Sequence, residues 1–599
     1  MSKRSTELTE RTESHAHEPA ISSAETVPDI EAASDTDART DIDSALAELA
    51  QGEKTWAELT LSARAGLVER VRDLTVEHAA DWVAAATSIK GLEPSSPLVG
   101  EEWMSGPYAF AGGLTTIAET LKGLDAGAGP LDDAKFGTAP GGRTTIEILP
   151  RGTFDHLLLN GYSGQVWLKP GIDDATAKRT AGLAQLTPTR TGGIGVVLGA
   201  GNITSIAPLD TLYELIANNR VVALKLNPIT DPMLPVLATV LQPFIEVGVL
   251  RIFTGGADVG TYLVGHDLVD HVHMTGSAIT HDAIVFGPGE TGAKRKAAAD
   301  PLLHKPITSE LGGVSPTIVL PGEWSSADIR YQAEHVATQR LHNSGYNCVA
   351  SQVIVVASGW KQRDEFVTAV RDALAAAPVR RAYYPGSDGR VGSAIDSYPR
   401  AQQLAGGRVL IDDLNPGEEA ALLNTEYFAP VLGVVELPYE GERFVAEAVA
   451  TANDKFIGTL GVNILAHPKT IAAMGSRFED MIADLRYGAV AVNAWTALAF
   501  LSPAATWGAF PGHTIDDVQS GIGIVHNALL VDGAERTVVR GPFRPSPRSL
   551  INREWSISPK PPWFVTNRTA ATTGRLLTAF AGSPSWAKLP AIFASALRG

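Results

Sequence analysis

The sequence predicts an α/β protein organised around a parallel, doubly wound sheet. Between residues 192 and 320, short apolar segments of strand length alternate with segments of helical periodicity. This alternation is typical of βαβ units, because parallel neighbouring strands need a crossover connection between them. A second α/β stretch continues to about residue 520. Since such sheets bind ligands at the carboxyl ends of their strands, polar residues that follow strands are the first candidates for a site.

Charge and cysteine content narrow the class of function. The chain has 49 Lys and Arg against 66 Asp and Glu, a formal net charge of −17, which disfavours a general binder of nucleic acid or anionic membranes. Cys348 is the only cysteine, which excludes an intrachain disulfide framework and a multi-cysteine zinc site. No apolar run reaches the roughly 18 residues of a membrane helix, and the N-terminus lacks the apolar core of a signal peptide. We therefore expect a cytoplasmic protein without an integral membrane segment.

The N-terminal part is predicted to be a tail followed by helices. Residues 1–40 carry nine acidic and four basic residues and few large apolar ones, so we expect an acidic, disordered tail. From Asp41 the pattern changes. The segment 62–86 repeats apolar residues at helical spacing, and a further helix is expected over 108–124.

Strands and helices are then expected in alternation. The helix over 230–246 is predicted to begin at Asp231 as its cap, with Pro232 in the first turn. The polar or small residues just past predicted strand ends are Asn202, Lys225, Gly276 and Ser277. The expected strands are 193–200, 220–226, 249–256 and 269–277, and the other expected helices are 208–219 and 257–266.

The second α/β stretch places Cys348 in a loop. A helix is predicted over 326–342, the Asn-Ser-Gly at 343–345 ends it, and 352–357 is a strand. A lone cysteine is most often a small buried hydrophobe. The loop position and the nearby glycine favour a functional role for Cys348, so that the two interpretations are about equally supported.

Two other residues have the chemistry that a thiolate nucleophile requires, namely a base and an oxyanion donor. Glu310 stands in the apolar, glycine-containing segment "ITSELGGVSP", and carboxylates are rarely buried without reason. Asn202 follows "VLGAG" before a predicted helix, so its amide would face an oxyanion or, equally well, cap the helix. His271 and His273 alternate on a strand but have no third ligand, so no metal site is predicted.

Six short motifs follow one another along the chain. They are "GAGNITSIAPLD" with Asn202, "VVALKLNP" with Lys225, "HMTGSAIT" with Gly276 and Ser277, "ELGGVSP" with Glu310 and Gly312, "NSGYNC" with Cys348, and "EYFAPV" with Glu426 and Phe428. No single motif is decisive, but their order and nearly their intervals resemble those of the aldehyde dehydrogenase superfamily, from about Asp41 to Leu530.

The resemblance implies oxidation of an aldehyde to the carboxylic acid with NAD or NADP, through a thiohemiacetal and a thioester on Cys348. It implies that Asn202 holds the oxyanion and that Glu310 is the general base. The residues for which it implies a cofactor-binding role are Lys225, Gly276, Ser277, Glu426, Phe428 and Gly312. Pro228 stands where the family often has a carboxylate that binds the adenosine ribose, so NADP is expected beside NAD.

The resemblance also implies an architecture. We expect a parallel-sheet cofactor domain, an α/β catalytic domain, and a small β-arm that pairs with a neighbouring subunit in a homodimer or homotetramer. A basic, proline-rich extension lies outside the resemblance. The expected ranges are 41–153 and 180–310 for the cofactor domain, 311–523 for the catalytic domain, 154–179 and about 524–540 for the arm, and 541–599 for the extension.

Three other functions compete with aldehyde oxidation. Transfer of the acyl group to coenzyme A would need no water-activating base, so Glu310 disfavours it. A non-catalytic aldehyde-dehydrogenase-like binding protein is disfavoured by the intact set of Asn202, Glu310 and Cys348. A cysteine hydrolase is disfavoured because no His stands in a recognisable partnering motif. The residues expected near the substrate entrance are apolar and predict a hydrophobic aldehyde: Ile203, Trp495, Phe500 and Leu501.

Overall fold

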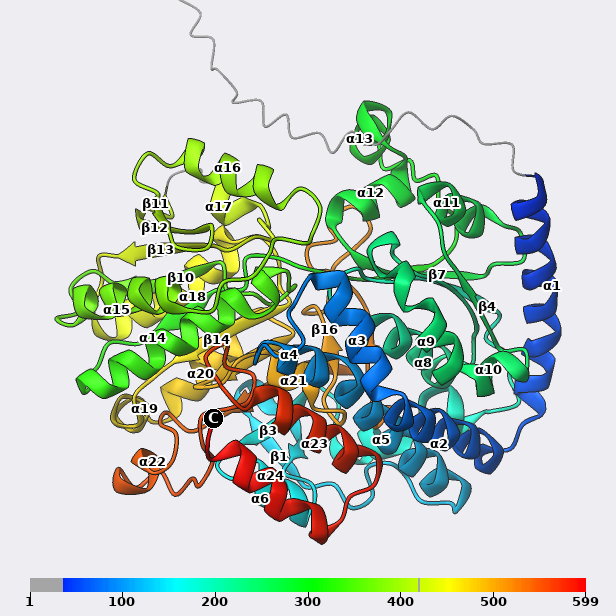
Figure 1. The fold of residues 1–599 in the computed structure, drawn as a ribbon, viewed down its shortest axis with the longest axis horizontal. Helices are drawn as coiled ribbons and strands as arrows, with labels where there is room; N and C mark the ends of the chain where they lie inside the picture. Colours follow the sequence, from blue (N-terminus) through cyan, green and yellow to red (C-terminus); the bar gives the residue numbers. More distant parts are fainter. Residues whose placement is uncertain (1–35, 418–420) are drawn as a thin grey trace, which may run out of the picture. The chain divides into compact units, whose positions relative to one another are not determined.

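The computed structural model describes residues 36–417 and 421–599 (Figure 1). The disorder expected for the N-terminal tail falls, up to residue 35, outside the described residues. Helix α1 (Thr36–Glu58) begins before the boundary expected at Asp41. Within the described ranges, no helix is both long and apolar enough to span a membrane.

The N-terminal helices cover one sheet of the protein. The single helix expected over 62–86 is two helices, α2 (Leu61–Glu77) and α3 (Ala79–Lys90), because the chain breaks at His78. Helix α5 (Ala109–Asp125) follows the short elements α4 (Val99–Trp103) and η1 (Met104–Tyr108), and it agrees with the prediction. Buried side chains of α2, α3 and α5 pack in one core with the strands of a six-stranded sheet.

The six-stranded sheet confirms the predicted parallel α/β unit. Its strand order is β17-β8-β7-β4-β5-β6, and every pair is parallel except β17 with β8. The crossover helices include α8 (Ile206–Ala217) and α11 (Ala257–Gly265). The strands are β4 (Ile194–Leu198), β5 (Val221–Lys225), β6 (Leu250–Phe253), β7 (His271–Gly276), β8 (Ile307–Leu311) and β17 (Gly521–Ile522).

One predicted helix of this unit is broken. Residues 230–246 were expected to form a helix capped by Asp231, but Asn227 is the cap, and its side chain accepts the N–H of Ile229. Prolines interrupt the intrahelical hydrogen bonds, because they lack an N–H. The segment therefore forms η4 (Pro228–Met233), α9 (Leu234–Val240) and α10 (Gln242–Glu246). Helices α12 (Ala278–Phe286) and α13 (Gly289–Ala297) follow β7.

An eleven-stranded mixed sheet forms the second core. Its order is β1-β2-β3-β19-β15-β14-β9-β10-β13-β12-β11. The predicted helix before the cysteine is α14 (Ser326–Leu341), which begins with a capping box between Ser325 and Asp328. Seven of its strands follow one another in the sequence, with β11 at the edge of the sheet: β9 (Thr317–Val319), β10 (Val353–Ala357), β11 (Gln402–Leu404), β12 (Arg408–Leu414), β13 (Val431–Leu437), β14 (Gly461–Leu465) and β15 (Ala489–Val492).

The strands of the segments expected to form a β-arm belong to the eleven-stranded sheet, and they are β3 (Ser163–Leu168) and β19 (Ala534–Arg540). Two strands from the range expected for the cofactor domain, β1 (Phe136–Ala139) and β2 (Arg143–Leu149), continue the same sheet beyond β3. Strand β19 pairs with β3 on one side and with β15 of the same chain on the other. The arm expected to pair with a neighbouring subunit is therefore joined, through β19, to its own catalytic sheet.

The C-terminal extension packs against its own chain. Its helices are α22 (Arg548–Ile551), α23 (Ala570–Gly582) and α24 (Leu589–Ala596). Phe580, Leu589 and Ile592 form an apolar cluster with Phe154 and Leu157 of α6 (Thr153–Leu158). Figure 1 shows α23 and α24, in red, beside α5 and α6.

Substituting Arg544 by alanine is expected to destabilise the protein. The Arg544 guanidinium donates to both carboxylate oxygens of Asp328, at 2.8 and 2.9 Å, and the two side chains are only 7% and 2% exposed. Removing one partner of a buried ion pair costs about 3–5 kcal/mol. We expect the lower end of this range, because Asp328 keeps Arg548 as a second cationic partner. Chemical unfolding followed by fluorescence would measure this loss. Arg553→Ala, at an exposed arginine, is the control, and equal unfolding midpoints of the two variants would contradict the prediction.

Candidate active site

The structure places three predicted residues at the carboxyl ends of two parallel strands of one sheet. Lys225 ends β5 and Gly276 ends β7, with β4 between the two strands. Ser277 caps α12, and its hydroxyl accepts the N–H of Thr280 at 3.2 Å. Burial lowers the pKa of Lys225, while the carboxylates of two nearby aspartates, Asp231 and Asp258, oppose this effect. This edge is where sheets of this class bind ligands.

The cysteine loop follows α14 directly. After this helix, Asn343 and Ser344 adopt left-handed backbone conformations, with φ of 53° and 57°. Non-glycine residues rarely adopt this conformation, and they cluster at functional sites. Cys348 lies between this turn and β10, and its carbonyl accepts a hydrogen bond from the Ser315 hydroxyl at 3.1 Å. Burial, and then the Glu310 carboxylate, raise the pKa of the Cys348 thiol well above its usual range.

Glu310 lies on β8 beside the cysteine. It is 2% exposed, and burial raises the pKa of its carboxyl to about 7, a value that the neighbouring Cys348 thiol moderates. The charge of Asp210 raises this pKa further, and His273 lowers it. Oε1 of Glu310 is buried and has no hydrogen-bond partner in the part of the chain that the structure describes. Glu310 and Cys348, predicted separately as base and nucleophile, are thus brought together.

Asn202 is held against the same loop. Its side-chain Nδ2 donates to the backbone carbonyl of Tyr346 at 2.9 Å. The Asn202 backbone carbonyl in turn accepts hydrogen bonds from Asn343 Nδ2 at 3.1 Å and from the Tyr383 hydroxyl at 3.2 Å. The amide is therefore fixed two residues along the loop from Cys348.

A cluster of buried charged residues contacts the turn that precedes Cys348. No sequence motif indicated this cluster. Glu101 accepts the backbone N–H of Asn343 at 2.9 Å and pairs with Arg380 at 2.5 Å. Lys90 and Glu102 pair at 2.9 Å beside it, with side chains 2% and 0% exposed. Buried charges persist when they are paired and hydrogen-bonded, so this cluster fixes the turn that precedes the cysteine.

The "ELGGVSP" and "EYFAPV" motifs also meet here. A Cβ atom at Gly312 would lie 1.9 Å from Oε1 of Glu426, so this approach requires glycine. Burial raises the pKa of the Glu426 carboxyl to about 8, and its Oε1 is buried without a partner among the described residues. Phe428 contacts the ring of Tyr346 in the cysteine loop, with 5.8 Å between ring centroids.

The apolar side of the site includes part of the C-terminal extension. Cys348 packs against a cluster that contains Trp495, Trp507 and Phe500. Trp563 and Phe564 of the extension belong to the same cluster. Trp495 and Phe500 were predicted from the sequence. The extension's contribution was not, because its segment lies outside every motif.

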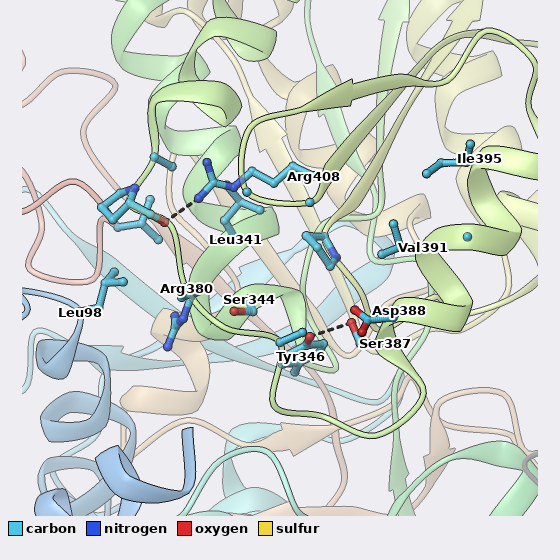
Figure 2. Close-up of a pocket in the computed structure, with 18 residues that line it drawn as sticks. Leu98, Leu341, Ser344, Tyr346, Arg380, Ser387, Asp388, Val391, Ile395 and Arg408 are labelled. Atoms are coloured by element: carbon cyan, nitrogen blue, oxygen red, sulfur yellow. Dashed lines mark hydrogen bonds between the residues drawn. The ribbon is translucent and has the colours of Figure 1, made fainter. Parts of the chain in front are cut away.

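One cavity borders the cysteine loop, and a second, smaller one lies beside the apolar cluster that Cys348 contacts. The larger has a volume of about 340 Å³, and Ser344 and Tyr346 of the cysteine loop lie on its wall (Figure 2). Figure 2 shows the hydrogen bond from the Tyr346 hydroxyl to Ser387, at 2.7 Å, across this wall. None of Cys348, Glu310 and Asn202 lines this cavity. The smaller cavity has a volume of about 30 Å³ and is bordered by Phe500, Trp507 and His526.

A second buried polar group was not predicted. Asp210 of α8 lies between two imidazoles, with its carboxylate 3.4 Å from Nε2 of His273 and 3.1 Å from Nε2 of His526. The alternation of His271 and His273 thus does not form a metal pair. His271 lies instead near Glu214, 3.9 Å away, and the described residues contain no group of three metal-ligating side chains. Histidines on an apolar strand were the only sequence signal for this group.

Comparison with known proteins agrees with these motifs. A model described as "Aldehyde dehydrogenase family" matches residues 178–402, which include Asn202, Glu310 and Cys348 and end before Glu426. The chain is 25% identical over 291 residues to a coniferyl aldehyde dehydrogenase from a Pseudomonas species, covering 45% of this chain and 56% of that protein. The chain thus spans about half the length of that relative.

Two further proteins extend the similarity over most of the chain. A 3,6-anhydro-alpha-L-galactose dehydrogenase from Streptomyces coelicolor is 24% identical over 482 residues, covering 76% of this chain and 80% of that protein. The solved NADP-dependent glyceraldehyde-3-phosphate dehydrogenase from Bacillus halodurans, complexed with NADP, has a TM-score of 0.57 at 17% identity, covering 84% of this chain and 91% of that one. The chain is therefore similar to the aldehyde dehydrogenase family over residues 178–402, and its relatives and the solved structures extend the similarity in sequence and in fold over most of the chain.

Proposed function

We propose that the protein oxidises an aldehyde to the carboxylic acid, with NAD or NADP as the oxidant. The observation that supports this most strongly is the buried Glu310 carboxyl, whose pKa is raised to about 7, beside the only cysteine of the chain. A base with such a pKa exchanges protons efficiently near neutral pH. The Asn202 amide, fixed on the same loop, adds a donor for the charge that develops during attack.

In the first step, Cys348 attacks the aldehyde carbon. Its raised pKa keeps the thiol protonated at rest, so the ionised Glu310 accepts the thiol proton as attack begins. The oxyanion of the thiohemiacetal is stabilised by the Cys348 backbone N–H and by Asn202 Nδ2. Nδ2 has two N–H groups and gives one to Tyr346, so the other is available. One such donor is typically worth about 3–4 kcal/mol.

The cofactor residues fit a nicotinamide dinucleotide. Glu426 has a buried oxygen without a partner among the described residues and the raised pKa of a desolvated carboxyl, as expected for a group that binds hydroxyls. Lys225, Gly276 and Ser277 would hold the adenosine and phosphate end, and Gly312 gives Glu426 its room. Phe428 would pack on the nicotinamide ring. When bound, the cofactor accepts the hydride.

In the last step, Glu310 activates water. After hydride loss the acyl group is held on Cys348 as a thioester, and the ionised carboxylate of Glu310 accepts a proton from the attacking water. The free acid leaves and the thiol is restored. The apolar wall of Trp495 and Phe500 supports a hydrophobic acyl group as the substrate.

The rate of thioester hydrolysis is expected to rise with pH through about 7. The cause is the raised pKa of Glu310, because only the ionised carboxylate accepts a proton and it is neutral below that pKa. Steady-state rates with a saturating aldehyde, between about pH 5.5 and 8.5, would measure the profile. A rate independent of pH over this range would contradict the assignment.

Purified protein with a panel of aldehydes tests the function. NAD and NADP run separately, with and without coenzyme A, and reduced nicotinamide and the acyl product are measured. Free acid as the product supports the proposal. Acyl-CoA as the product would favour the acyl-transfer alternative. Cofactor binding without turnover of any aldehyde would favour a non-catalytic binding protein.

The proposal also includes the oligomeric state of the protein and its location in the cell. We keep a homodimer or homotetramer and a cytoplasmic location as predictions. Because β19 pairs on both sides within the chain, the assembly would use surfaces other than the edges of this strand. Light scattering on purified protein would give the mass of the assembly.

A further inference from the structure

We propose that Asp210, His273 and His526 carry protons from Glu310 to the small cavity beside His526. The inference rests on the proposed function, because it takes Glu310 as the base of thioester hydrolysis. Glu310 is 2% exposed, yet it must release one proton for every water it activates. The proton that leaves this buried base must therefore reach solvent either past the bound substrate or through side chains of the protein.

Three polar side chains converge on one buried carboxylate. The Asp210 side chain is 0% exposed and accepts the Thr275 hydroxyl at 2.9 Å. Nε2 of His273 lies 3.4 Å from one carboxylate oxygen of Asp210. Nε2 of His526 lies 3.1 Å from the other oxygen. Burial alone would raise the pKa of Asp210, but the two histidines lower it. A fully buried ionised group of this kind is costly, and its cost is offset only by such pairing.

The strand register connects this group to Glu310. In the parallel pair of β7 and β8, Thr275 is opposite Glu310 and His273 is opposite Thr308. Because side chains alternate along a strand, these four residues face the same side of the sheet. Nδ1 of His273 lies 2.9 Å from the Thr308 hydroxyl, which fixes the ring. His273 is close enough to Glu310 that each charge shifts the pKa of the other group.

His526, the member of the group most distant from Glu310 along the path, borders the small cavity. His526 is 13% exposed, against 3% for His273 and 0% for Asp210. Its Nδ1 is buried and has no hydrogen-bond partner in the described ranges. The small cavity has a volume of about 30 Å³. A cavity of that size, with a polar group on its wall, is large enough for one water molecule.

The transfer conserves protons and charge. The O–H bond of Glu310 breaks as its proton passes to the Thr308 hydroxyl, which lies on the same face of β8 and gives its own proton to Nδ1 of His273. The Nε2–H bond of His273 breaks at the same time, and that proton passes to Asp210. Asp210 passes a proton to His526, and an N–H bond of His526 breaks as an O–H bond forms on the water in the cavity. One proton has then moved from Glu310 to water, and each imidazole carries its proton on the other ring nitrogen. The path resets when both imidazoles exchange tautomers before the next turnover. Asp210 and the two histidines are positioning residues that act through Glu310 and touch no substrate.

One nearby histidine lies outside this path and supplies a control. His271 is on the same strand and is buried like His273, but it faces Glu214 at 3.9 Å, and Arg220 pairs with that glutamate. Burial, and then the charge of Arg220, lower the pKa of His271 to about 3, so it stays neutral. Its loss would remove a buried imidazole without interrupting the path.

The test compares His526→Ala, Asp210→Asn and His271→Ala by rapid mixing with aldehyde and cofactor. The first turnover of reduced nicotinamide reports attack and hydride transfer, and later turnovers include hydrolysis. We expect the first turnover to be unchanged in all three variants. Later turnovers should slow at least about tenfold in the first two variants. Imidazole added to His526→Ala should restore the later turnovers in proportion to the imidazole concentration. Such rescue would not occur if His526 only supported the structure.

The outcomes separate the two proposals. Later turnovers at the unmodified rate in both His526→Ala and Asp210→Asn would overturn the proton path and leave the proposed function intact. Equal slowing in His271→Ala, without rescue by imidazole in His526→Ala, would also overturn it, as a packing effect. A missing first turnover in the unmodified protein with every aldehyde would overturn the proposed function and the path together.

Discussion

Replacing Cys348 with serine is expected to abolish aldehyde oxidation. The reason is that the nucleophile must lose its proton to Glu310 as it attacks the aldehyde. Glu310, with a pKa of about 7, accepts a proton from a thiol far more readily than from an alcohol, whose pKa is much higher. Loss of the nucleophile typically costs on the order of 10⁴-fold or more in turnover. Reduced-nicotinamide formation, followed over hours at high protein concentration, would set the limit.

The serine variant has its own control. Cys348 is outside the set of residues proposed to bind the cofactor, so the affinity for NAD or NADP should be unchanged, as should the unfolding midpoint. Turnover within about tenfold of the unmodified protein would show that Cys348 does not attack the substrate.

Replacing Glu310 with glutamine is expected to separate the two halves of the reaction. The amide cannot accept a proton from water, so thioester hydrolysis should slow by roughly 10²–10⁴-fold, the usual contribution of a general base. The substitution also removes the negative charge that helps raise the pKa of Cys348. Glu310 is also the proposed acceptor of the thiol proton, so the first turnover should be slower than in the unmodified protein. It should still persist, because without the nearby negative charge the thiol loses its proton to solvent more readily.

Rapid mixing distinguishes the phases of this variant. A first turnover close to one equivalent per site, followed by a slow phase, is the predicted pattern. Glu426→Gln, at a second buried carboxyl of the site, is the matched control, because it should weaken cofactor binding without causing the thioester to accumulate. Rapid later turnovers in Glu310→Gln would show that another group activates water.

The sequence predicted the residues that local motifs define. Asn202, Lys225 and Gly276 follow strands whose apolar runs and crossover helices are visible in the chain, so their meeting at one sheet edge could be foreseen. Cys348 was predicted to lie in a loop because the Asn-Ser-Gly break ends α14. These predictions rest on local rules of periodicity and chain breaking.

Contacts between distant segments were not predictable in this way. Trp563 approaches the site from the far end of the chain, and nothing in its own segment indicates that partner. Strand β19 was expected in an arm, but its strand partner within the chain depends on register over long sequence separations. Asp210 lies within the helix expected over 208–219, and only the fold shows the two histidines beside it.

Mass spectrometry of the Glu310→Gln variant tests acyl transfer through Cys348 most directly. The protein would be mixed with an aldehyde and NAD or NADP, quenched in acid and digested. A mass increase equal to the acyl group, on the peptide that contains Cys348 and absent without cofactor, is the predicted result. Formation of reduced nicotinamide and free acid with no adduct on that peptide at any time would contradict a thioester intermediate on this cysteine.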